Sequence, residues 1–73
     1  MTEAAERKRL LSELAAARRT SGLTQTVVAA RMGTSTSAVA RLEHGEINPT
    51  LATIQRFAAA IGKKVRWQVS NSR

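Results

Sequence analysis

The stretch that decides the fold runs over residues 25–45 and reads QTVVAARMGTSTSAVARLEHG. Small and apolar residues recur at helical spacing in its two halves, 25–32 and 36–44. Gly33 ends the first half, and Ser35 stands where a hydroxyl side chain caps the start of a helix. The stretch therefore predicts two short helices joined by a tight turn.

Helices are also predicted on both sides of this stretch. Residues 3–20 contain strong helix formers without Gly or Pro, and their apolar residues share one face. After a loop at 46–49, Thr50 is placed to cap a further helix. Its apolar stripe comprises Leu51, Ile54, Phe57 or Ala58, and Ile61. We therefore expect an all-α domain of four helices over residues 1–62.

The last segment has a different periodicity. Apolar and polar residues alternate in KVRWQVS, residues 64–70, with Val65, Trp67 and Val69 in the apolar places. This pattern predicts a β-strand whose partner comes from a second copy of the chain, because no other segment offers a strand. Residues 63–73 are then a dimerisation strand and tail. The alternative is a frayed tail whose Trp67 packs back on its own helices.

Composition limits the possible functions. Among the 73 residues are 12 Lys and Arg against five Glu and no Asp, a formal net charge of +7, which suits a polyanionic partner. The absence of Cys, the single His and the scattered Glu leave too few groups for metal, thiol or paired-carboxylate chemistry, so we expect no enzyme and no cofactor. No apolar run is long enough to span a bilayer or form a signal peptide, and a cytoplasmic protein is expected.

The 25–45 string resembles the helix-turn-helix of phage repressor and Cro-like proteins, the Xre family. The resemblance rests on Gln25 at the start of a helix, a small residue at Ala29 where the two helices cross, Gly33 in the turn, and the closing E-H-G. It extends over about residues 11–62. It implies a repressor-like four-helix domain, with the helix-turn-helix proper at residues 25–44.

The resemblance also implies roles for individual residues. The positions that meet base edges are Ser35, Thr36, Ser37 and Arg41. The positions that contact DNA phosphates are Gln25, His44 and Asn48. A structural salt bridge is expected between Arg18 and Glu43. The sequence departs from the family pattern at Thr34, where an apolar residue is usual, and at Val27, where a polar one is usual.

Each of these side chains also has an ordinary interpretation. Gln25 could be an exposed helix residue, Ser35 only a cap, and Arg41 a solvated charge; the whole motif, and not any one residue, favours the functional interpretation. For His44 the two interpretations are evenly balanced. If Arg41 does enter the groove, it is the only one of the four base-reading candidates that can pair bidentately with guanine.

Two functions follow from the resemblance. The first is a homodimeric, sequence-specific regulator that binds double-stranded DNA and represses transcription at a near-palindromic operator. The alternative is a HigA- or HipB-like antitoxin, which binds a protein toxin as well as its own promoter. Residues 47–73 carry five Lys and Arg and no acid, so this basic end suits either flanking phosphates or an acidic protein. Action at a membrane is disfavoured, because the apolar stripes are needed for the core.

Overall fold

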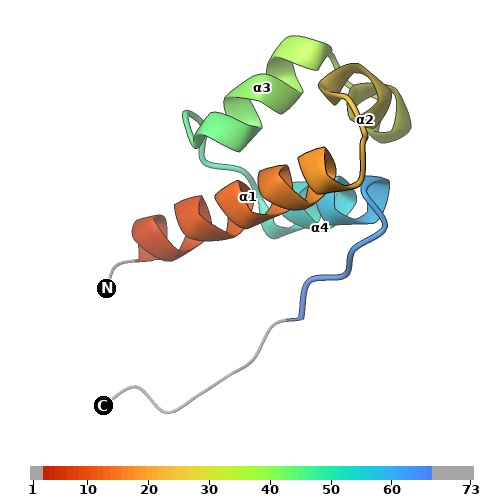
Figure 1. The fold of residues 1–73 in the computed structure, drawn as a ribbon. Coiled ribbons are helices and arrows are strands. Elements are labelled where there is room, and N and C mark those ends of the chain that lie inside the picture. Colours follow the sequence, from red (N-terminus) through yellow and green to blue (C-terminus); the bar gives the residue numbers. More distant parts are fainter. Residues whose placement is uncertain (1–2, 67–73) are drawn as a thin grey trace.

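A computed structural model describes residues 3–66 of the chain (Figure 1). Its helices are α1 (Glu3–Thr20), α2 (Gln25–Met32), α3 (Thr36–His44) and α4 (Leu51–Ala60), and residues 3–66 contain no strand. The expected all-α fold of four helices is thus confirmed. None of these helices is both long and apolar enough to cross a membrane.

Local signals set the helix boundaries. Each of the last three helices follows a hydroxyl residue whose side-chain oxygen accepts a hydrogen bond from the backbone N–H three residues further on, at 3.1 Å. These capping residues are Thr24, Ser35 and Thr50. At the other ends of α2 and α3, Gly33 and Gly45 have φ angles of 71° and 72°, a left-handed conformation that glycine adopts without steric cost. The α2–α3 turn can therefore be short.

The helices enclose one apolar core. Helix α1 packs against α3 and α4, and α2 packs against the same two helices, with α3 and α4 on opposite sides of α1 in Figure 1. The largest fully buried side chains come from all four helices and are Leu11, Val28, Val39, Ile54 and Phe57. Burying a side chain of this size stabilises the fold by about 1.5–3 kcal/mol. This core holds α2 and α3 in a fixed relative position.

One expected core residue lies outside the core. Leu51 is 58% exposed, whereas Ile54, Phe57, Ala58 and Ile61 are all buried. The expected apolar stripe is thus wrong at its first position. Leu51 is the first residue of α4, directly after the loop, and the neighbouring helices do not cover it there.

The C-terminal segment is described only up to residue 66. Residues 63–66 have no regular structure, so the strand predicted for residues 64–70 is not present at 64–66. The physical reason is that residues 3–66 contain no second strand with which it could pair. Val65 is half-buried and packs against the core. Trp67 and Val69, the other two residues of the predicted dimer contact, lie outside the described residues.

Candidate nucleic-acid interface

Helix α3 turns one polar face away from the core. Val39 and Leu42 are buried, and the side chains on the outer face are exposed. The exposed residues include four of the predicted contacts, namely Thr36, Ser37, Arg41 and His44. Ser37 and Arg41 are four residues apart and therefore lie one above the other on the same face. The outer face of α3 thus presents hydroxyls at its start and the Arg41 and His44 side chains further along.

The hydroxyls of the first turn differ in how they are engaged. The Ser35 oxygen accepts a hydrogen bond from the Ala38 N–H at 3.1 Å, and Thr36 donates to the Thr26 hydroxyl on α2 at 3.3 Å. In the described part of the chain, the Ser37 and Arg41 side chains make no hydrogen bond or ion pair. Their full hydrogen-bonding capacity therefore remains for a ligand.

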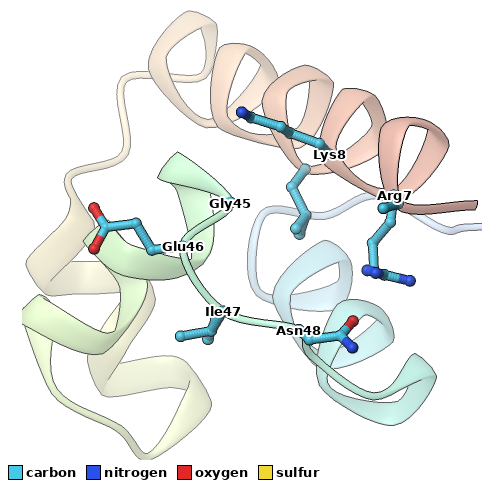
Figure 2. Close-up of a pocket in the computed structure, with 8 residues that line it drawn as sticks. Arg7, Lys8, Gly45, Glu46, Ile47 and Asn48 are labelled. Carbon is cyan, nitrogen blue, oxygen red and sulfur yellow. The ribbon is translucent and has the colours of Figure 1, made fainter.

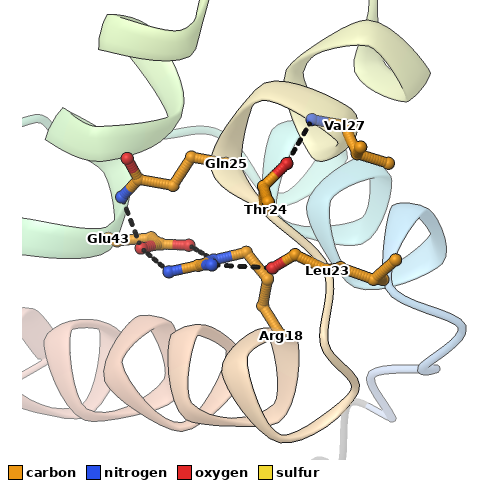
Figure 3. A network of polar contacts seen from close by, with 6 residues as sticks. All are labelled: Arg18, Leu23, Thr24, Gln25, Val27 and Glu43. Carbon is orange, nitrogen blue, oxygen red and sulfur yellow. Dashed lines mark hydrogen bonds and ion pairs between the residues drawn. The ribbon is translucent and has the colours of Figure 1, made fainter.

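A buried polar network holds the last turn of α3 against α1 and α2 (Figure 3). Glu43 accepts hydrogen bonds from the Arg18 Nε at 2.5 Å and from the Arg18 Nη2 at 3.0 Å, a bidentate pair. Arg18 also donates from Nη1 to the Leu23 carbonyl oxygen at 2.8 Å. Only 10% of the Arg18 side chain and 5% of the Glu43 side chain are exposed. The expected Arg18–Glu43 pair is thus present.

Gln25 belongs to the same network. Its Nε2 donates to the Glu43 Oε1 at 2.9 Å, so its amide ties the start of α2 to the end of α3. The sequence-based hypothesis gave Gln25 a phosphate contact and missed this bond, because residues 18 positions apart carry no local signal of contact. One N–H of the half-buried amide is left for a second acceptor.

The network lowers the pKa of Glu43. Burial alone would raise the pKa of this carboxyl, but hydrogen bonds from Arg18 and Gln25, and the charges of Arg18 and Arg19, stabilise the anion and outweigh burial. Because the folded-state pKa is depressed, ionised Glu43 stabilises the fold above the unfolded-state pKa. This contribution is lost as the pH falls through the folded-state pKa.

We therefore expect the free energy of unfolding of the wild-type protein to fall with acidification below the ordinary pKa range of glutamate. Glu43→Gln should flatten this dependence, because the variant lacks the titrating group. Urea denaturation at a series of acidic pH values measures it. Glu13→Gln, which alters an exposed carboxyl on α1, is the matched control. An equal pH dependence in both variants would contradict the role of the Glu43 anion.

The remaining two predicted contacts lie at and beyond the end of α3. His44 is the last residue of α3, and Asn48 belongs to the loop before α4; both are exposed. Asn48 lines a cavity of about 320 Å³ between this loop and α1, where its side chain lies near that of Arg7 (Figure 2). Sequence reasoning did not connect Arg7 with Asn48.

Comparison with known families identifies this arrangement. Residues 14–68 match the family model described as Helix-turn-helix. The chain belongs to the helix-turn-helix family. The resemblance to Xre-type proteins, inferred from the 25–45 string, is thereby confirmed.

Two curated relatives of this helix-turn-helix protein show how far the similarity extends. It is 45% identical over 56 residues to the uncharacterized HTH-type transcriptional regulator y4dJ of Sinorhizobium fredii, covering 77% of this chain and 73% of the relative. It is 36% identical over 66 residues to the antitoxin HigA1 of Mycobacterium tuberculosis, covering 90% of this chain and 44% of the antitoxin. The chain thus spans less than half the length of that antitoxin. No solved structure matches this helix-turn-helix protein significantly.

Proposed function

We propose that this protein is a regulator of transcription that binds double-stranded DNA sequence-specifically, as a homodimer, and represses at a near-palindromic operator. The observation that carries the proposal is the outer face of α3, where Ser37 and Arg41 are exposed and unengaged, on a helix anchored by the Arg18–Glu43 pair. In this proposal residues 1–62 form the DNA-binding domain.

In the proposed complex α3 enters the major groove, which is wide enough to admit an α-helix. Arg41 is the principal reader, since a guanidinium can donate two hydrogen bonds to the O6 and N7 of one guanine. Thr36 and Ser37 approach the bases closely because their side chains are small. Ser35 has one acceptor site occupied by the Ala38 N–H and can still donate its hydroxyl hydrogen.

Phosphate contacts flank this helix. The first N–H groups of α2 lack intrahelical partners and favour an anion, and the free N–H of the Gln25 amide adds a donor there. We assign Gln25 to a phosphate contact on one strand of the duplex. His44 and Asn48 are assigned to phosphate contacts beyond the end of α3. The formal charge of +7 supports this sequence-independent part of the binding.

Arg41→Ala tests the base-reading role. We expect the variant to lose about 1–3 kcal/mol of discrimination at one base pair of each half-site, because the bidentate donor is gone. Selection of bound duplexes from a random pool defines the operator, and competition with single-base variants of it measures the loss. Arg9→Ala, an exposed cation on α1, is the control. An Arg41→Ala protein with an unchanged base preference would overturn the assignment.

The homodimer is proposed from the sequence pattern of residues 64–70. Val65, Trp67 and Val69 would face the helices, and the backbone of the strand would pair with its counterpart in the second subunit. The half-buried position of Val65 against the core supports this orientation. Two recognition helices set about 34 Å apart would then meet successive major grooves on one side of the duplex.

A second candidate function is that of an antitoxin. It is favoured by the similarity to HigA1, which extends over 66 residues of this chain. In this case the protein would bind a protein toxin in addition to DNA. Purification together with the product of a neighbouring gene tests the proposal: a stoichiometric complex supports it, and a protein that purifies alone from cells expressing both genes contradicts it.

A further inference from the structure

A cavity of about 320 Å³ lies between the first half of α1 and the loop that follows α3 (Figure 2). Its polar lining comes from Arg7 and Lys8 on α1 and from Glu46 and Asn48 on the loop. None of the functional assignments made from the sequence includes a residue of α1 other than Arg18. Of the residues that line the cavity, Asn48 belongs to those assignments, so it is the α1 side of the cavity that needs its own explanation.

No acidic partner among residues 3–66 neutralises the two cations that line this cavity. Among the described residues, neither Arg7 nor Lys8 forms an ion pair or a side-chain hydrogen bond. The Glu46 carboxylate points away from both, and the Arg7 guanidinium lies near the Asn48 amide (Figure 2). The Lys8 ammonium points away from both of these side chains, so the Arg7 guanidinium and the Asn48 amide supply the hydrogen-bond donors that an oxyanion in this cavity requires (Figure 2).

The Lys8 side chain packs against the end of α3. Its stem lies against the end of α3 so closely that a Cβ placed on Gly45 would come within 3.0 Å of the Lys8 Cγ. Glycine at this position therefore serves two purposes, the left-handed turn and the space for the lysine stem. The stem thus packs beside the same loop that carries Asn48.

We propose that this cavity binds one phosphate group of the DNA backbone, with Arg7 as the main ligand and Asn48 as a supporting donor. The inference rests on the proposed function and extends it to α1. A major groove that receives α3 is bordered by a phosphate backbone on each side. Gln25 approaches the last turn of α3 from α2, whereas the cavity approaches the following loop from α1. The two sites are therefore formed by different segments of the chain.

The salt dependence of DNA binding tests this proposal. Binding of a short mixed-sequence duplex is measured by fluorescence anisotropy at several NaCl concentrations for the wild type, Arg7→Gln, Arg7→Lys and Arg9→Gln. Arg9 is an exposed cation on the same helix that does not line the cavity, so it controls for net charge. We expect Arg7→Gln to reduce the slope of log affinity against log salt by about one, and to weaken binding roughly tenfold at low salt, equally for all sequences.

The possible outcomes separate this inference from the function on which it rests. If the wild type binds with a steep salt dependence and Arg7→Gln behaves like Arg9→Gln, the cavity does not hold a phosphate, although the proposed function stands. If the wild type binds no duplex, the proposed function and the site are both wrong. Recovery of the wild-type slope in Arg7→Lys, together with unchanged helical circular dichroism in every variant, attributes the effect to the charge and not to unfolding.

Discussion

Arg18→Leu and Glu43→Leu should each lower the free energy of unfolding by about 3–5 kcal/mol, and the double variant should lose much less than the sum. Each single change leaves the partner charge in a site where only 10% of Arg18 and 5% of Glu43 is exposed. The stranded carboxylate would keep only the Gln25 hydrogen bond, and the stranded guanidinium only the Leu23 carbonyl. The cost of the single variants is therefore mainly that of an unpaired buried charge.

Urea denaturation of the wild type, both single variants and the double variant measures the coupling directly. Arg9→Leu is the control, because Arg9 is an exposed arginine of the same helix and is not among the groups that stabilise the Glu43 anion. We expect the control to shift the free energy of unfolding by less than about 0.5 kcal/mol. If the losses in free energy of unfolding of the two single variants add up to that of the double variant, the two charges do not stabilise each other. That result would contradict the bidentate pair.

The helices of this protein were predictable because their boundary signals are local. A hydroxyl such as Ser35 caps the N–H three residues ahead, and a glycine such as Gly33 or Gly45 ends the helix that precedes it. These interactions involve residues close in the chain, so they can be recognised in the sequence. Arg18 and Glu43 are 25 positions apart in the chain, and their pairing was predicted only from the family resemblance.

Contacts that depend on how the helices pack could not be derived in this way. Arg31 donates to the Ala60 carbonyl oxygen at 2.8 Å, and Arg56 donates to the Met32 carbonyl oxygen, so each arginine serves the end of another helix. In the sequence these arginines look like any exposed cation on a helix. The Gln25–Glu43 bond joins α2 to α3, and the cavity lies between α1 and the loop after α3. Neither could be derived from the sequence, because each brings together residues that are far apart in the chain.

Removal of residues 67–73 should convert the protein into a monomer and reduce its affinity for the operator by about 10²- to 10⁴-fold, because the two half-sites would no longer be bound as one unit. The truncation keeps Val65, which packs against the core, so the helical circular dichroism should change little. Analytical ultracentrifugation measures the oligomeric state, and titration of a labelled operator measures the affinity. Removal of residues 71–73 alone, which lie beyond the predicted strand, is the control.

The physical basis of this prediction is the hydrogen-bonding requirement of a strand. The backbone groups of residues 64–70 can form a ladder only with another strand, and residues 3–66 provide none in the same chain. Burial of Trp67 against the helices would add on the order of 3 kcal/mol per subunit, which is large for a domain of this size. If the protein without residues 67–73 remains a tight dimer, the subunits associate through their helices. The exposed Val27 or Leu51 would then be the place to seek the interface.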